Sequence, residues 1–536
     1  MNRLAWLDWL VIALYFGLTF GAAWLYTRRE HVHESSGQYF LAGRNVGWFV
    51  VGASLFASNI GSEHLVGLAG TGAARGVAVG QFEVLASLIL LLLGWVFVPF
   101  YLRSGVTTMP EFLERRYSPA ARWYLAVVSI VAYVLTKISV TIAAGGIVFS
   151  ALMGLDFWVG ALIVIVATGL YTILGGLRAV LITDTLQLFV LLIGSLVVTL
   201  VSVNAAGGWT QLRATAAPGF FDMWLPATDP DFPWTGILLG APILGVWYWC
   251  TDQFIVQRVL AAKNLDHARG GTIFAGLLKL LPVVLFVIPG VAAHALVQQG
   301  KLHLDRPDQA LPALVTALLP AGLRGIVVAG LLAALMSSLS SVFNSCSTLM
   351  TFDIYRKLRP QASERQLVVF GQVSTAVLVG LALLWIPLMA RISGQLYQYL
   401  QSVQAYISPP IAAVFLLGLF WTRVNARGAM AALLTGFVVG AARLILELNA
   451  GSLGGGPLLA FAKMNFLHFA AMLFAVCAAV LVLASLSAPA PSREHLAGLT
   501  YATAGPSVPT RHGMRLVVLS WLVALGVALT WWVFRS

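Results

Sequence analysis

The sequence predicts an all-α integral membrane protein with about fourteen transmembrane helices. Apolar residue types make up 59% of the 536 residues and charged types only 10%, whereas a soluble chain of this length needs far more charge to cover its surface. A helix that crosses a membrane needs about 20 apolar residues, and the alternating pattern of a membrane β-barrel does not occur. The predicted spans are 5–27, 46–70, 77–101, 121–150, 157–175, 179–203, 236–258, 272–297, 323–350, 366–389, 395–420, 428–448, 466–488 and 514–533.

Basic residues set the orientation that we expect for these spans. We interpret span 5–27 as a retained helix that runs from outside to inside, not as a removed signal peptide. Most loop residues with a positive charge, such as Arg28, Arg103 and Lys263, then lie on the cytoplasmic side, as the positive-inside rule requires. The net charge of +12 thus indicates membrane topology and no nucleic-acid partner. Both termini are predicted to lie outside the cell membrane.

The chain is predicted to form a single transmembrane domain over residues 1–536. Its parts are an extra N-terminal helix at 5–27, a core at 46–420, C-terminal helices over 428–533 and a cytoplasmic linker at 489–513. A Walker-type phosphate-binding loop is absent from the sequence, which argues against an ATP-driven pump. The sequence also lacks a credible nucleophile–base pair or metal cluster, so we expect no enzyme, no organic cofactor and function as a monomer.

Two predicted spans look interrupted. The second contains ASNIGSEHLVGLAG (57–70), where glycines surround polar side chains, and the seventh contains GVWYWCTDQFIVQR (245–258). These spans are five apart, and broken helices at matching places of two five-helix halves indicate a transporter built as an inverted repeat. The alternative is that the glycines only allow close helix packing.

Ionisable residues at membrane depth are costly and each one suggests a function. Gly175 and Gly176 break the chain before Asp184, which lies within an apolar run. A carboxylate there either pairs with a cation or stays neutral. The others are Glu63, His64, Glu83, Asp252 and Lys279.

Small hydroxyl side chains form a stripe on the span 323–350. Spacings of three and four residues place them on one helix face, where they either allow close packing or supply oxygen ligands to a hard cation such as sodium. The stripe consists of Ala334, Ser337, Ser338, Ser340, Ser341 and Asn344.

Aromatic and amide side chains crowd the outer half of the span 395–420. Aromatic faces and two-way hydrogen-bonding amides suit a polyhydroxylated ligand, although an aromatic belt at the membrane interface is the alternative. These residues are Tyr397, Gln398, Tyr399, Gln401, Gln404 and Tyr406.

Five segments resemble the sodium/solute symporter family, and within it the sodium–glucose cotransporter branch. They are SNIGSEHLVGLAGTGAARGVAVGQFE (58–83), YTILGGLRAVLITDTLQ (171–187), VWYWCTDQFIVQRVLAAKN (246–264), LMSSLSSVFNSCSTLMTFDIY (335–355) and YLQSVQAYISPPIAAVFLLGLFWTRVN (399–425). The resemblance covers about residues 8–430 and implies a LeuT-like core of five plus five helices.

The resemblance also implies one sodium site and leaves open a second. In the first site, the backbone carbonyls of Ala57 and Ile60 on the broken second span are ligands. The other ligands come from the span 323–350, here called the serine helix: the carbonyl of Ala334 and the hydroxyls of Ser337 and Ser338. Some relatives have a second site, whose residues here are Asp184, Ser337, Ser340 and Ser341.

The same resemblance implies a sugar site and gates. The substrate-binding residues are Asn59, His64, Glu83, Tyr248, Trp249, Lys279 and Gln401. The outer gate consists of Leu68, Phe82 and Tyr397, and Tyr248 forms the inner gate beneath the sugar ring. Two positions depart from relatives, because Gly245 and Ala86 replace side chains that can hydrogen-bond a sugar hydroxyl.

We therefore expect a sodium-coupled symporter for a neutral sugar, a hexose such as glucose or galactose. Lys279 is the one cation expected near the substrate, opposed by Glu83, which disfavours an anionic solute. Three alternatives stay open: a symporter of the same family for inositol, one for sialic acid or another organic solute, and a sugar-responsive sensor or channel without coupled uptake. No partner for Glu63 is evident from the sequence.

Overall fold

The computed structural model describes residues 4–29, 35–389, 396–505 and 512–535, with the backbone alone at 26–29, 62, 63, 147, 174, 382, 385–389 and 396–399. Ten helical stretches among these residues are long and apolar enough to cross a membrane, and two shorter apolar helices accompany them. The all-α prediction is confirmed, and every predicted span overlaps helix. The count of fourteen crossings stays a prediction, since several spans are joined or broken.

Both interrupted helices occur where the sequence predicts them. The second span consists of α3 (Trp48–Asn59) and α4 (Ser62–Arg75), separated by Ile60 and Gly61 in non-helical conformations. The seventh consists of α12 (Trp234–Leu239), α13 (Ala241–Gly245), the π-helical turn η6 (Val246–Thr251) and α14 (Gln253–Leu260). Asp252 breaks it with ψ 128°, and its carboxylate accepts a hydrogen bond from the Phe254 N–H at 3.2 Å. This bond caps the start of α14.

The longest helix, α10 (Phe157–Ala205), joins the fifth and sixth predicted spans across a kink. The kink lies at Gly176, whose φ is 53° and ψ −155°. A Cβ atom at this position would lie 2.5 Å from the Tyr39 carbonyl oxygen, so both the conformation and the space require glycine. The predicted break before Asp184 is thereby confirmed.

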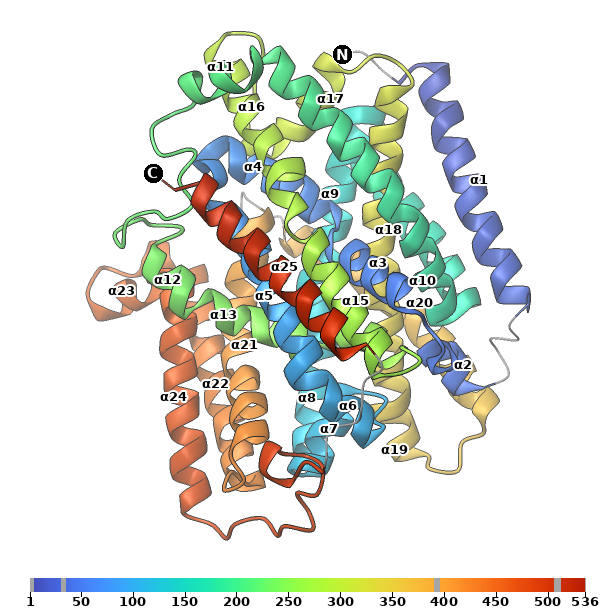
Figure 1. Ribbon diagram of the computed structural model, residues 1–536, viewed down its shortest axis with the longest axis vertical. Coiled ribbons are helices and arrows are strands. Elements are labelled where there is room, and N and C mark those ends of the chain that lie inside the picture. Colours follow the sequence, from blue (N-terminus) through green and yellow to red (C-terminus); the bar gives the residue numbers. More distant parts are fainter. Residues whose placement is uncertain (1–3, 30–34, 390–395, 506–511, 536) are drawn as a thin grey trace.

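The remaining elements complete the bundle (Figure 1). Their bounds are α1 (Trp6–Arg29), α2 (Ser36–Leu41), α5 (Gln81–Leu92), η3 (Leu93–Phe97), α6 (Val98–Ser104), α7 (Met109–Arg116), α8 (Pro119–Tyr133), η4 (Val134–Ile138), α9 (Ser139–Val148), α11 (Gly208–Thr215), α15 (Leu265–Leu278), α16 (Ile288–Gln298), α17 (Ala310–Leu318), α18 (Leu323–Leu349), η9 (Met350–Tyr355), α19 (Arg356–Leu358), α20 (Glu364–Met389), α21 (Leu396–Phe420), α22 (Ala426–Leu448), α23 (Pro457–Lys463), α24 (Phe466–Leu486) and α25 (Gly513–Val533).

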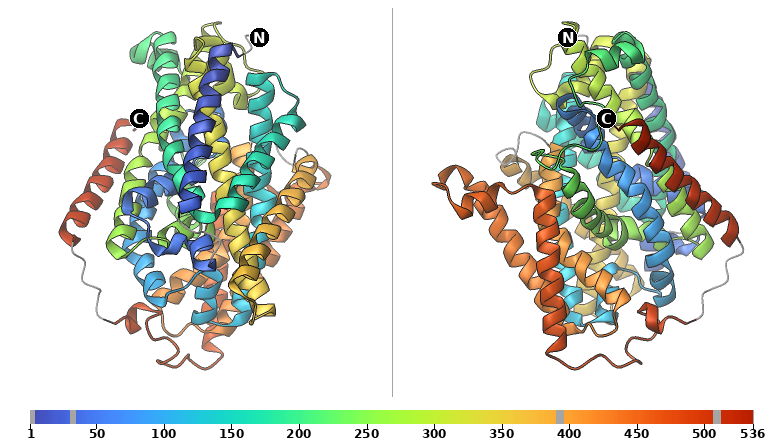
Figure 2. Two further views of the ribbon diagram at one scale, coloured as in Figure 1. Left: turned by 90° about the vertical axis from the view of Figure 1, so that its right-hand side faces the viewer. Right: turned by 60° about the vertical axis from the view of Figure 1, so that its left-hand side comes forward.

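The helix α18, which carries the serine stripe, belongs to the most enclosed of the ten membrane-spanning stretches. Of the best membrane-spanning window on that helix, 94% is buried, against 17% for α25 at the periphery. Figure 2 shows α1 alongside α10 and α18, and α25 standing at the outer edge beside α5 and α15. A helix buried on all sides holds its polar face inside the protein, where hydroxyl groups can serve a ligand or a neighbouring helix.

The N-terminal helix is fastened to α18 by a buried carboxylate. Asp8 Oδ1 accepts hydrogen bonds from the N–H groups of Gly322 and Gly325, both at 2.7 Å, and Oδ2 accepts one from Ala5 N–H at 2.9 Å. A Cβ atom on Gly325 would lie 2.7 Å from Asp8 Cα. Glycine therefore allows α1 to approach the start of α18, where a negative charge also favours the helix dipole.

We predict that Asp8→Ala lowers the stability of the protein by about 2–3 kcal/mol, because two buried N–H groups of another helix lose their acceptor. Thermal unfolding in detergent measures the effect. Asp156→Ala is the control, since Asp156 caps only its own helix, α10, at an exposed site. A melting temperature that falls no further for Asp8→Ala than for Asp156→Ala would contradict this role.

Candidate functional site

A cavity lies where the two interrupted helices meet α5, α15 and α21. All seven residues predicted to bind substrate line this cavity, which encloses about 530 Å³ of space counted to its mouth. These residues are Asn59, His64, Glu83, Tyr248, Trp249, Lys279 and Gln401. The fold thus brings together the predicted side chains, which are up to 342 residues apart in sequence (401 minus 59).

A buried ion pair forms one wall of the cavity. Lys279 Nζ donates to Glu83 Oε2 and to Asn59 Oδ1, and its side chain is 1% exposed. The ammonium also lies 5.3 Å from the centre of the Trp249 ring, a cation–π arrangement. A lysine this deep in a membrane protein is tolerated because a carboxylate pairs with it. The pair fixes three helices, α3, α5 and the end of α15, around one point.

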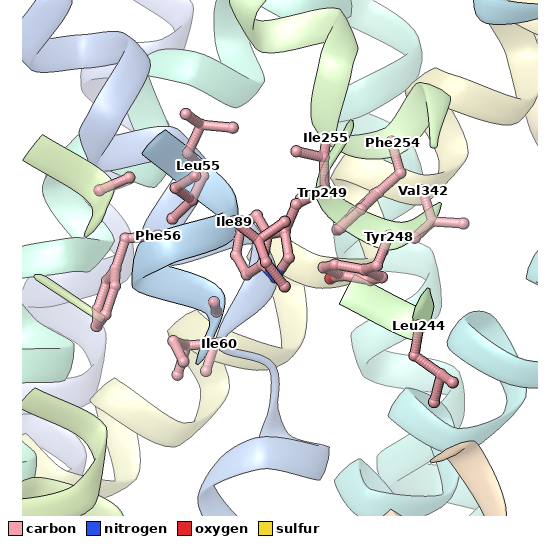
Figure 3. Packing of buried hydrophobic residues seen from close by; sticks show 14 of the residues in the cluster. Leu55, Phe56, Ile60, Ile89, Leu244, Tyr248, Trp249, Phe254, Ile255 and Val342 are labelled. Atoms are coloured by element: carbon pink, nitrogen blue, oxygen red, sulfur yellow. The ribbon is translucent and has the colours of Figure 1, made fainter. Parts of the chain in front are cut away.

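The aromatic residues Tyr248 and Trp249 line the cavity, and Figure 3 shows them among the buried residues beside Phe254. The Tyr248 hydroxyl accepts hydrogen bonds from Asn59 Nδ2 at 2.9 Å and from Lys137 Nζ at 3.0 Å. The same ammonium lies 4.8 Å from the Tyr248 ring centre and 5.3 Å from that of Phe254. Tyr248 is therefore held in place by groups from two other helices.

Lys137 corrects an expectation from the sequence. Lys279 is not the one cation near the site, because Lys137 lines the same cavity. The signal was present, since Lys137 is a lone charge in the apolar run of the fourth predicted span. Its ammonium contacts both the hydroxyl and the ring of Tyr248.

The other predicted residues lie at the walls and mouth. His64 Nε2 lies 3.9 Å from Glu83 Oε1. Phe82 lines the cavity, and its ring packs 6.1 Å from Phe232. Leu68 is fully buried on α4 and does not line the cavity. The side chains of Tyr397, Gln398, Tyr399 and Glu63 lie outside the described residues.

One departure from the family pattern has a structural counterpart. A Cβ atom on Gly245 would lie 2.1 Å from Ile89 Cδ1, so the Ile89 side chain occupies the space that a larger residue would take. Ala86 lies one helical turn earlier on α5 and also lines the cavity. This wall is apolar where the sequence comparison leads one to expect hydroxyl or amide groups.

The break in the second span leaves backbone carbonyls available. The Gly61 N–H donates to the Asn59 carbonyl at 3.0 Å, and the His64 N–H donates to the Gly61 carbonyl at 3.0 Å. In a regular helix these two N–H groups would serve the carbonyls of Ala57 and Ile60. The carbonyls predicted to bind sodium are thus freed from the helical pattern.

The serine helix reaches this break from the other side. Ser338 Oγ donates to the Ser58 carbonyl at 3.1 Å, which places the hydroxyl beside the unwound backbone. Ala334 lies one turn earlier on the same buried helix. Neutral carbonyl and hydroxyl oxygens from two elements are the ligands that a hard cation prefers.

A second polar cluster surrounds Asp184. Its carboxylate accepts hydrogen bonds from Ser54 Oγ at 2.5 Å and Ser58 Oγ at 2.9 Å through Oδ2, and from Ser337 Oγ at 2.5 Å through Oδ1. Asp184 is fully buried. Three helices, α3, α10 and α18, therefore meet at one carboxylate.

Arg258 of α14 joins this cluster, and the sequence reasoning missed it. Nε donates to Ser54 Oγ at 3.1 Å and Ser58 Oγ at 2.8 Å, and one terminal nitrogen lies 3.8 Å from Asp184. The guanidinium also donates to Ser341 Oγ and to the Phe254 carbonyl. Because Arg258 stands near the predicted cytoplasmic end of its span, the sequence suggested a loop residue.

The residues of the second predicted sodium site are only partly brought together. Ser337 contacts Asp184, whereas Ser341 Oγ bonds to Ser58 and accepts from Arg258. Ser340 Oγ donates to the Ser337 carbonyl of its own helix at 3.0 Å. Ser340 thus points along the helix in this conformation.

Comparison with known proteins identifies the family of the chain. The model of the sodium:solute symporter family matches residues 39–436. The sodium/glucose cotransporter 1 of Oryctolagus cuniculus is 42% identical over 519 residues, covering 89% of this chain and 78% of that protein. The sodium/myo-inositol cotransporter of Homo sapiens is 40% identical over 542 residues, covering 92% and 75%.

Solved structures support the fold. A Na+-coupled sialic acid symporter in a substrate-bound outward-open state matches with a TM-score of 0.76 at 21% identity, covering 91% of this chain and 99% of that one. Mhp1, a nucleobase-cation-symport-1 family transporter, matches with a TM-score of 0.55 at 15% identity, covering 86% and 97%. The expected LeuT-like core is therefore confirmed. The chain belongs to the sodium:solute symporter family and is a sodium-coupled membrane transporter of a small solute, not an enzyme.

Proposed function

We propose that the protein takes up a neutral hexose, such as glucose or galactose, together with sodium. The observation that carries the proposal is the single cavity that collects all seven predicted substrate residues beside the unwound segment at Ile60 and Gly61. Sodium/glucose cotransporters among the relatives support a sugar as the solute.

The lining suits a polyhydroxylated ring. Tyr248 offers an aromatic face on which the apolar face of a sugar can stack. Gln401 and Gln404 line the cavity with groups that both donate and accept. Asn59, Glu83 and Lys279 are already joined to one another, so they present fixed donors and acceptors to incoming hydroxyls. Preorganised groups of this kind reduce the free-energy cost of binding.

The charges favour a neutral solute. Lys279 is paired with Glu83, and Lys137 lies against the hydroxyl and ring of Tyr248. An anionic solute needs a cation without a competing partner, but Lys279 is already paired with a carboxylate and Lys137 already contacts Tyr248. An anionic sugar would have to break the Lys279–Glu83 pair, leaving a buried carboxylate without its cation.

Coupling follows from the shared broken helix. Sodium from outside binds the carbonyls of Ala57 and Ile60 together with the hydroxyls of Ser337 and Ser338, and so fixes α3 against α18. The same segment carries Asn59 and His64 into the sugar cavity. Sodium then raises sugar affinity by favouring one conformation, and sugar does the same for sodium. An inward-negative membrane potential adds about 2.3 kcal/mol per charge per 100 mV.

A second sodium and a different polyol are the alternatives within this mechanism. Asp184 with Ser337 is the part of the second site that would bind the additional ion. The sodium/myo-inositol relative makes inositol, also a neutral ring of hydroxyls, the leading alternative solute. The apolar wall at Ile89 and Gly245 would contact one face of the solute ring by van der Waals packing and not by hydrogen bonds.

Uptake into proteoliposomes tests the function. We expect labelled glucose or galactose to accumulate under an inward sodium gradient and not under a matched potassium gradient, because only sodium binding stabilises the sugar-binding conformation. Myo-inositol and sialic acid are measured in parallel. Preferential inositol uptake would replace hexose as the substrate, and equal uptake in both gradients would exclude coupled transport.

We predict that Gln401→Ala weakens hexose binding roughly two- to tenfold, which corresponds to one hydrogen bond of about 0.5–1.5 kcal/mol. The half-saturating sodium concentration without sugar should stay the same, since Gln401 lies away from the serine helix stripe. Binding titrations in detergent measure both constants. Gln211→Ala, at an exposed position of α11, is the control. An unchanged hexose constant would remove Gln401 from the site.

For the ion, we expect Ser338→Ala to raise the half-saturating sodium concentration roughly fivefold or more, because one oxygen ligand is lost. Ser347→Ala is the matched control: Ser347 is buried on the same helix, and its hydroxyl donates to the Gly371 carbonyl at 2.7 Å, away from the break. Sodium-dependent uptake curves distinguish the two. If both variants shift equally, Ser338 is not a sodium ligand.

A further inference from the structure

A second hollow lies beside α6, a helix found in the lower part of Figure 1. It encloses about 1740 Å³ counted to its mouth, and it shares no lining residue with the sugar cavity. It is formed by η3 and α6, by the turn between α14 and α15 with the start of α15, by Arg44, and by the segment at 501–505. The transport mechanism uses none of these residues.

Four cations line this hollow, and its described lining contains no Asp or Glu. The cations are Arg44, Arg103, Lys263 and Arg269. They come from three separate stretches of the chain, at 44, 103 and 263–269, so the fold brings them together. Like charges brought this close repel one another, and an anionic ligand removes that repulsion.

Two of the cations are positioned by neutral groups. Arg44 donates to the carbonyls of Gly105 and Val106, both at 3.0 Å, and Arg269 donates to the Gly94 carbonyl at 3.2 Å. These bonds fix the guanidinium groups without cancelling their charge. Asp266, on the same helix as Arg269, is close enough to attract that charge, but it does not line the hollow. Arg103 and Lys263 are exposed at the rim.

The other wall of the hollow is apolar and aromatic. It includes Trp95, Pro99, Phe100, Leu102 and Leu265. The Arg269 guanidinium lies 4.4 Å from the Trp95 ring centre, and Tyr501 packs with its ring centre 4.8 Å from Phe100. A soluble phosphate compound has no apolar surface to bury against this wall, whereas a lipid would bury its glycerol and upper acyl chain there.

We propose that this hollow binds the phosphate headgroup of an anionic phospholipid from the adjoining membrane leaflet. Trp95 and Tyr501 have the amphipathic rings typical of the membrane interface. The hollow also lies next to α25, whose outer face exposes Trp521, Leu522 and Leu525 at 72%, 50% and 64%. Basic pockets at this depth are suited to anionic headgroups. The bound lipid joins α6, the α14–α15 turn and residues 501–505.

Native mass spectrometry of the full-length protein in detergent tests the proposal. Phosphatidylglycerol, phosphatidylcholine and soluble glycerol 1-phosphate are titrated separately. We expect a bound phosphatidylglycerol that phosphatidylcholine does not replace and glycerol 1-phosphate does not displace. Equal retention of phosphatidylcholine would overturn the proposal, and binding of glycerol 1-phosphate without phosphatidylglycerol would overturn the lipid assignment.

Variants then locate the site. Arg103→Gln with Lys263→Gln should weaken phosphatidylglycerol binding roughly tenfold or more, since each cation near a membrane surface contributes about a factor of five. Arg103→Lys with Lys263→Arg should keep binding, which separates charge from misfolding. Arg359→Gln with Arg427→Gln removes two exposed charges from the same end and is the control. Equal weakening by both neutralising pairs, or none by the first, would overturn the site.

Discussion

The two residues at which the second span loses its helical hydrogen bonds are the constraint on which the site depends. Because the Gly61 and His64 N–H groups donate to nearer carbonyls, the carbonyls of Ala57 and Ile60 lose these regular helical donors, while Asn59 and His64 line the cavity. Backbone without its regular partners is tolerated at membrane depth only where protein or ligand surrounds it. The buried helix α18 supplies that enclosure, and in the proposed mechanism the ion and the solute share this short piece of chain.

Buried charges hold the remaining helices around this piece. Lys279 at the end of α15 donates to Glu83 of α5 and to Asn59 of α3. The network extends from Asn59 to the Tyr248 hydroxyl, which also accepts a hydrogen bond from Lys137. On the other side of the break, Asp184 collects hydroxyls from α3 and α18. Each network joins helices from both halves of the repeat. Differential affinity between conformations needs such cross-connections, because a group that touches one helix cannot sense its movement.

Much of this arrangement could be predicted from the sequence, and the failures have a common cause. Apolar run length located the spans, and glycine beside polar residues located both breaks and the kink at Gly176. The family pattern assigned residues that do surround one cavity. Lys137 stood out in the sequence as a charge in an apolar run, but only the fold shows that it contacts Tyr248. Arg258 was missed because it lies at the end of its span and its contacts with Asp184 and the serines come from other helices. Likewise, only packing reveals that Ile89 fills the space beside Gly245.

The guanidinium of Arg258 has a consequence for the evolution of the chain. It serves hydroxyls of α3 and α18 and a carbonyl of its own helix while facing Asp184. A lysine would keep the charge, but its compact ammonium cannot replace the planar guanidinium, whose five donors reach several acceptors at once. A shorter neutral residue would leave a buried carboxylate uncompensated. A single replacement at this position is therefore expected to be costly, and a matching change at Asp184 or at the serines around it is needed to offset that cost.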